Sequence, residues 1–146
     1  MSRAKARQLA DAALRRGEPL VWFEELYAEV ESASLSSVPW ADLEPNPNLV
    51  AWLDRSKIDG RGRRALKVGC GLGDDAEELA RRGFDVVAFD VSPSAICIAK
   101  RRFPESPVRY EVADLFDSPD WVGGFDLVLE SYTLQVLPPS LRLEAM

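Results

Sequence analysis

From Ala65 onward the sequence alternates short apolar runs with helical runs, and this alternation constrains the fold more than any other feature. Four apolar runs predict strands at residues 65–70, 84–90, 108–114 and 125–131. Helical runs predict helices at 74–83, 92–103 and 138–146. Strands separated by helices of this length form βαβ units with parallel strands. The expected fold class is therefore α/β, a parallel sheet flanked by helices.

The first third of the chain has a different pattern. Helices are predicted at residues 3–16, 20–31 and 48–56, with Asn46 or Asn48 as the cap of the third. Trp22 and Tyr27 lie on the apolar face of the second helix, which favours core packing for both. We expect a single domain in two parts: N-terminal helices in residues 1–62 and an α/β core in 63–146.

Composition excludes several classes of function. The formal net charge is −6, which disfavours nucleic acids and anionic membranes as partners. The chain has no histidine, so a Ser-His-Asp triad, a Cys-His pair and every histidine zinc site are excluded. Cys70 and Cys97 lack metal-ligand spacing and are predicted to be buried packing residues. A reduced, cytoplasmic protein without a metal is expected.

The turn after the first predicted strand is the candidate binding site, because ligands bind at the carboxyl ends of parallel strands. It reads Gly69-Cys70-Gly71-Leu72-Gly73 and continues with Asp74 and Asp75. A dinucleotide fingerprint would need a glycine at position 74, and two carboxylates at a helix start repel a pyrophosphate. The favoured ligand therefore lacks phosphate and can carry positive charge. A glycine-rich turn without a ligand is the alternative, with the two acids complementing the helix dipole.

Asp90 ends the second predicted strand, 21 residues after Gly69. An acid at this position can accept hydrogen bonds from both hydroxyls of a ribose, and it disfavours a 2′-phosphate. The alternative is that Asp90 caps the next helix. Ser92, followed by Pro93, already fits that role. Ribose binding is therefore the preferred interpretation of Asp90.

The segment "VGCGLGDDAEELARRGFDVVAFDVSPSAI" resembles the cofactor-binding core of class I S-adenosylmethionine-dependent methyltransferases. The resemblance implies a Rossmann-like fold and S-adenosyl-L-methionine as cofactor, with S-adenosyl-L-homocysteine as product. It implies cofactor contacts from the loop, and from a set of later residues: Asp90, Val91, Asp114, Leu115 and Glu130. Of these, Asp114 in "YEVADLFD" takes the position that contacts the adenine amino group. The segment "FDLVLESYTLQVLPP" resembles the part that passes the methionine end of the cofactor.

The N-terminal stretch "WFEELYAEVESASLSSVPWADLEPNPNLVAWL" is similar to the lid of the thiopurine-methyltransferase-like branch, and it places Trp40 as a cofactor or substrate wall. Two features depart from the family pattern. Lys67 stands where many members have an acid that helps to anchor the methionine amino group. Only four strands of the larger family sheet are predicted, so we expect a truncated chain whose fourth strand is an open apolar edge. A homodimer through that edge would cover it.

These observations favour a methyltransferase that acts on a small molecule by in-line methyl transfer. The sulfonium is already a strong leaving group, so positioning alone can contribute about 7–11 kcal/mol. Glu130 and Tyr132 follow the fourth strand and are candidates for deprotonating the acceptor. The alternatives are a truncated or inactive cofactor-binding domain that pairs with a partner chain and, disfavoured by Asp74, an NAD-dependent oxidoreductase.

Overall fold

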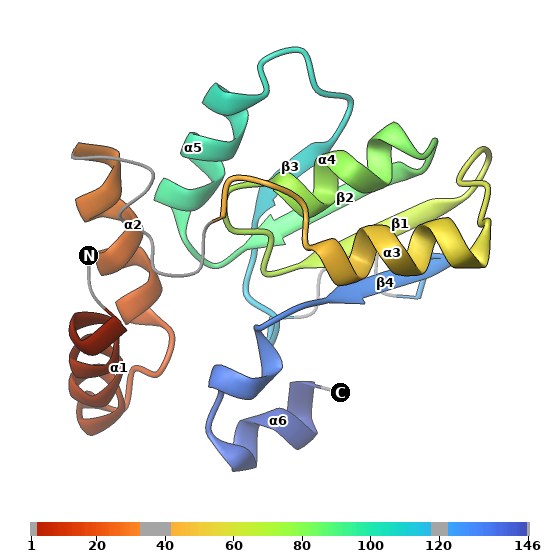
Figure 1. Cartoon of the computed structure of the whole chain (residues 1–146). Coiled ribbons are helices and arrows are strands. Elements are labelled where there is room, and N and C mark those ends of the chain that lie inside the picture. Colours follow the sequence, from red (N-terminus) through yellow and green to blue (C-terminus); the bar gives the residue numbers. More distant parts are fainter. Residues whose placement is uncertain (1–2, 33–41, 118–122, 146) are drawn as a thin grey trace.

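The computed structural model of the chain describes residues 3–32, 42–117 and 123–145 (Figure 1). Its helices are α1 (Arg3–Arg16), α2 (Val21–Ser32), α3 (Pro47–Ser56), α4 (Asp74–Arg81), α5 (Pro93–Arg102), the 3-10 turn η2 (Leu134–Val136) and α6 (Pro139–Ala145). Its strands are β1 (Arg64–Val68), β2 (Asp85–Asp90), β3 (Arg109–Val112) and β4 (Leu127–Glu130).

The four strands form one parallel sheet in the order β3-β2-β1-β4, which confirms the predicted fold class. β1 is central, and its last residue, Val68, lies opposite Phe89 on one side and Glu130 on the other. The carboxyl ends of these three strands therefore meet at one edge of the sheet. The loops that follow them are brought together there.

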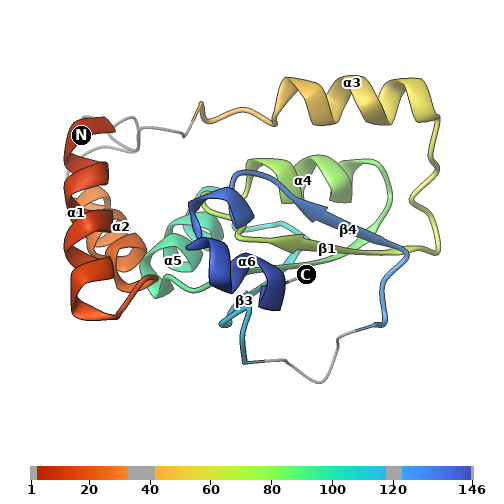
Figure 2. The ribbon, with the colours of Figure 1, turned by 90° about the horizontal axis from the view of Figure 1, so that it is seen from below.

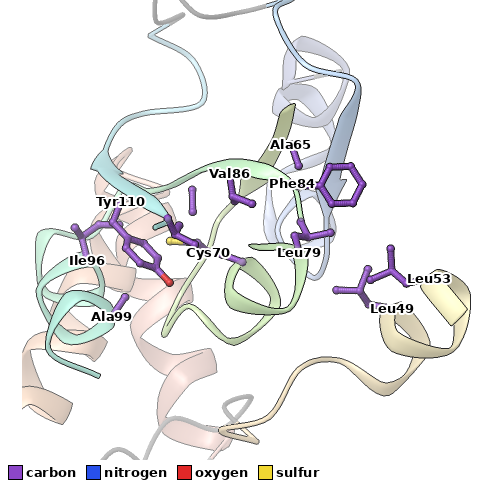
Figure 3. Packing of buried hydrophobic residues seen from close by; sticks show 13 residues of the cluster. Leu49, Leu53, Ala65, Cys70, Leu79, Phe84, Val86, Ile96, Ala99 and Tyr110 are labelled. Atoms are coloured by element: carbon purple, nitrogen blue, oxygen red, sulfur yellow. The ribbon is translucent and has the colours of Figure 1, made fainter. Parts of the chain in front are cut away.

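Helices α3, α4 and α5 cover one face of the sheet (Figures 1 and 2). Figure 3 shows the cluster between them: Leu79 of α4 lies between the sheet and the leucines of α3, and the residues from α5 lie beside Tyr110 of β3. Leu49 and Leu53 come from α3, so this helix packs on the α/β core although it belongs to the N-terminal part of the sequence. Full burial of one such leucine is worth about 1.5–3 kcal/mol. A second cluster, including Val87 and Phe89, lies on the opposite face.

Helices α1 and α2 form a pair beside α5 (Figures 1 and 2). Trp22 and Tyr27 are both buried in this contact, as the apolar face of α2 predicts. Glu24 adds a polar connection, because its carboxylate accepts hydrogen bonds from the Ser92 hydroxyl (2.5 Å) and from the Ser94 hydroxyl (2.7 Å) and amide (3.1 Å). The N-terminal helices are thus fastened to the first turn of α5.

The predicted helix caps are confirmed, but one packing prediction is wrong. The Asn46 side chain accepts a hydrogen bond from the Asn48 amide, and the Ser92 hydroxyl accepts one from Ala95. Cys97, predicted to be buried, is exposed. The buried stripe of α5 consists of Ala95, Ile96, Ile98 and Ala99, which leaves position 97 on the outer side of the helix. No helix within the described residues is long and apolar enough to cross a membrane.

Candidate functional site

A cavity of about 470 Å³ lies at the carboxyl ends of the strands, a size that suits a cofactor or small metabolite. Its lining comes from the loop after each strand, from α2 and from the segment before α3. The lining residues at the strand ends include Gly69, Cys70, Gly71, Leu72, Asp90, Val91, Ala113, Leu115, Tyr132 and Thr133. Most of the sequence-predicted cofactor residues are therefore in one place.

The glycine loop is held tightly by its protein neighbours. Gly71 has φ +52°, and a Cβ there would lie 2.9 Å from the Tyr27 hydroxyl oxygen. Gly73 has φ +96°, and a Cβ there would lie 2.6 Å from the Tyr110 hydroxyl oxygen. Larger residues would both strain the backbone and displace these two tyrosines. The loop can therefore keep its backbone close to whatever occupies the cavity.

Asp90 is buried beside this loop and holds part of it in place. Its Oδ2 atom accepts a hydrogen bond from the Gly71 amide (2.9 Å), and Oδ1 accepts one from the Ser92 amide (3.0 Å). Burial raises the pKa of Asp90, and these two amide hydrogen bonds counter part of that shift. A carboxylate offers about four acceptor positions, so acceptor capacity remains beside these backbone amides. The hydroxyls of a ribose could use it.

The two acids after the glycines have different surroundings. Asp74 forms a bidentate ion pair with Arg102, with both N–O distances 2.7 Å. Its charge is therefore compensated within the protein, which the sequence alone did not reveal because Arg102 is 28 residues away. Asp75 accepts a hydrogen bond from the backbone amide of Asn46 (2.8 Å) and lines the cavity. The repulsion of phosphate expected from this turn thus depends mainly on Asp75.

Lys67, the departure from the family pattern, also lines the cavity. Its ammonium donates hydrogen bonds to the carbonyl oxygens of Val68 (3.0 Å) and Gly69 (3.3 Å). Burial lowers the pKa of Lys67, whereas the charges of Asp75, Asp90 and Glu130 act in the opposite direction. The amine therefore lies within the electrostatic field of several carboxylates.

The segments after β3 and β4 contribute apolar and aromatic surface. Leu115 and Phe116 line the cavity, whereas Asp114 is not among the described lining residues. The Asp114 Oδ1 atom accepts a hydrogen bond from the Phe116 amide (2.9 Å).

Glu130, another predicted site residue, stabilises a turn. Its Oε1 atom accepts hydrogen bonds from the amides of Thr133 (2.7 Å) and Leu134 (2.8 Å). Tyr132 belongs to that turn in the sequence. Its side chain lines the cavity and is 65% exposed. Trp40 lies outside the described residues.

Other ionisable groups near the loop are poor candidates for catalysis. Burial raises the pKa of the Cys70 thiol, so Cys70 stays protonated and acts as a small packing residue. Burial and the hydrogen bond to Glu77 raise the pKa of Tyr110. In the described part of the chain no group of three or more metal-ligating side chains forms.

A parallel sheet with a glycine loop after its first strand, and an acid ending its second, is typical of α/β domains that bind nucleosides. Comparison with known proteins identifies the family. Residues 65–146 match the family model described as the methyltransferase domain, and the chain belongs to this family. It spans about half the length of the curated relatives it matches.

One relative is the 2-heptyl-1-hydroxyquinolin-4(1H)-one methyltransferase of Mycobacteroides abscessus, 30% identical over 82% of this chain and 53% of the relative. A solved structure described for the conversion of a disulfide bond into a thioacetal group during echinomycin biosynthesis is 31% identical, with a TM-score of 0.70 over 84% of this chain and 52% of that one. The N-methyltransferase NodS of Bradyrhizobium japonicum, solved with S-adenosyl-L-homocysteine, is 25% identical, with a TM-score of 0.62 over 82% of this chain and 63% of that one.

Proposed function

We propose that this chain binds S-adenosyl-L-methionine and transfers its methyl group to a small-molecule acceptor. The observation that carries the proposal is the buried carboxylate of Asp90, which ends β2 with acceptor capacity left over, beside a glycine loop. Asp75 in the next turn disfavours a phosphate-bearing ligand. The named methyltransferase relative and the NodS structure with S-adenosyl-L-homocysteine support this choice.

Each part of the cavity then has a role. Asp90 accepts hydrogen bonds from the ribose, and the backbone of Gly69–Gly73 approaches the nucleoside closely. Val91 and Leu115 supply apolar contacts. Asp114 would contact the adenine amino group, as its resemblance to the family position implies. The cofactor, when bound, supplies a methyl group on a sulfonium leaving group. The chain's own contribution is positioning, worth about 7–11 kcal/mol.

Tyr132 is the preferred candidate for contact with the methyl acceptor. It lines the cavity, whereas one oxygen of Glu130 is occupied by two backbone amides. A phenol at this position can accept a hydrogen bond from the acceptor and assist its deprotonation.

Three finer proposals concern the whole protein. The packing of α1 and α2 beside the cavity supports a lid of the thiopurine-methyltransferase-like type. The acidic composition favours a small acceptor over a nucleic acid. Two free cysteines agree with a cytoplasmic location.

A second function is favoured by one observation, the outer edge of β4. In the sheet order β3-β2-β1-β4 of the described residues this strand has a neighbour on one side, and Val128 on one of its faces is 58% exposed. An unpaired strand edge can pair with another chain. The chain would then be an inactive cofactor-binding domain that pairs with a partner chain, and a second copy of itself would give a homodimer. Sedimentation of the chain over a range of concentrations distinguishes this proposal, and a Val128→Lys variant should stay monomeric.

Titration calorimetry with S-adenosyl-L-homocysteine tests the main proposal, with NADH as the competing cofactor. Asp90→Ala should weaken binding about 100-fold, because each hydrogen bond to a charged group contributes about 1.5–3 kcal/mol. Asp85→Ala is the matched control, since Asp85 is an exposed acid at the start of the same strand. Absence of binding by the folded wild-type chain, or binding of NADH instead, would contradict the proposal.

A further inference from the structure

Lys67 occupies an unusual position for a lysine. It lies in the central strand of the sheet, between Leu66 and Val68, and only 2% of it is exposed. A charged side chain is rarely buried to this extent unless it is paired, because removing it from water is costly. The proposed methyl transfer gives Lys67 no role. Its presence in the cavity wall therefore requires a separate explanation.

The hydrogen bonds of Lys67 leave it incompletely compensated. An ammonium has three N–H donors, and two of them are directed to the carbonyl oxygens of Val68 and Gly69. Lys67 forms no ion pair with the residues that the structure describes. The carboxylates of Asp75, Asp90 and Glu130 act on it from a distance. Both oxygens of Asp90 and the Oε1 atom of Glu130 already accept amide hydrogen bonds. One N–H and most of a positive charge remain for an anion.

Asp75 supplies the opposite charge in the same cavity. Its negative charge acts on Lys67, and both residues line the cavity. Its Oδ1 atom accepts the Asn46 amide. Further acceptor capacity remains, because a carboxylate has about four acceptor positions. The same cavity is thus lined by an ammonium and by a carboxylate whose charges attract each other.

An α-amino acid carries a carboxylate and an ammonium on the same carbon atom, and it matches such a lining. Lys67 is on β1, the strand next to the one that Asp90 ends, with Lys67 opposite Ala88 in the register. The two residues can therefore contact different ends of one ligand. We propose that Lys67 determines specificity for the amino-acid end of the cofactor by binding its carboxylate, with Asp75 accepting its ammonium. This inference rests on the proposed function.

Calorimetry with two nucleosides tests it: S-adenosyl-L-homocysteine and its decarboxylated form, which keeps the ammonium. The wild-type chain should prefer the intact compound by about tenfold or more, equivalent to about 1.4 kcal/mol. Lys67→Met, which keeps the length of the side chain, should remove most of that preference and leave the affinity for the decarboxylated compound almost unchanged. Lys100→Met, an exposed lysine on α5, is the matched control and should behave as wild type.

The outcomes separate this inference from the proposed function. If the wild-type chain binds neither nucleoside, both are overturned. If it binds both with equal affinity, only the role of Lys67 is overturned, and this comparison needs no variant to fold. If Lys67→Met weakens both compounds equally, its role is structural and the inference fails. A deaminated analogue compared between wild type and Asp75→Asn tests the ammonium contact in the same way.

Discussion

Tyr132 is held in the left-handed backbone region, with φ 62°, directly after β4. Residues with a Cβ lose about 1–2 kcal/mol in this conformation. Glu130 maintains it, because its Oε1 atom binds the amides of the next two residues, Thr133 and Leu134. The strained residue is thus the one whose exposed phenol lines the cavity. Backbone strain of this kind is common at functional sites.

Replacing Tyr132 by glycine should relieve this strain. We expect Tyr132→Gly to be more stable than Tyr132→Ala by about 1 kcal/mol, measured by urea unfolding. The alanine variant is the control because it also removes the phenol but keeps the Cβ. Equal stability of the two variants would show that the turn relaxes without the tyrosine.

At the level of elements, the attachment of α2 to α5 depends on Glu24. Partial burial opposes ionisation of Glu24, but the hydrogen bonds from Ser92 and Ser94 outweigh it and lower its pKa below the usual 4.5. A lowered pKa stabilises the folded state above the unfolded-state value. That stability is lost as the pH falls through the folded-state pKa.

Glu24→Gln should therefore cost about 1 kcal/mol at pH 7, a typical value for losing a side-chain helix cap. The difference from wild type should shrink as the pH falls below the usual 4.5 and through the lowered pKa of Glu24, because wild-type Glu24 then becomes protonated as well. Urea unfolding monitored at pH 7 and over that lower range measures this, with Glu25→Gln as the control because Glu25 forms only an exposed ion pair with Arg16. A cost that does not change with pH would contradict the assigned hydrogen bonds.

For the molecule as a whole, the cavity has the same sign of charge as the chain, which is negative. The net charge is −6. Among the described residues, the cavity is lined by one base, Lys67, and by the acids Asp42, Glu44, Asp74, Asp75 and Asp90. Such a field attracts cations, and salt screens it.

S-adenosyl-L-methionine carries a sulfonium charge that S-adenosyl-L-homocysteine lacks. Raising the salt concentration from 50 mM to 500 mM should therefore weaken binding of the first about threefold more than binding of the second. Calorimetric affinities of the two compounds at both salt concentrations provide the comparison. A common salt dependence would mean that the acids do not act on the sulfonium.

Sequence reasoning predicted the sheet and the places of the glycine loop and Asp90 in it, because each depends on local pattern: alternation of elements, spacing of glycines, an acid at a strand end. It missed what depends on residues far apart in the chain. The ion pair of Asp74 with Arg102 is one example, and the exposure of Cys97 is another, since only the packing of neighbouring helices decides which side of α5 faces out. The sequence indicates Glu130 and Tyr132 as candidates, but it does not predict the turn in which Glu130 binds the amides that follow Tyr132.

The central position of β1 and β2 has a consequence for how the cavity opens. The glycine loop and Asp90 extend from the two strands that have neighbours on both sides, where local unfolding is most costly. The other walls come from α2, from the segment before α3 and from the loops after the two edge strands, β3 and β4. Transient local opening should therefore occur in these walls first, so that a ligand can enter and leave while the glycine loop and Asp90 keep their positions.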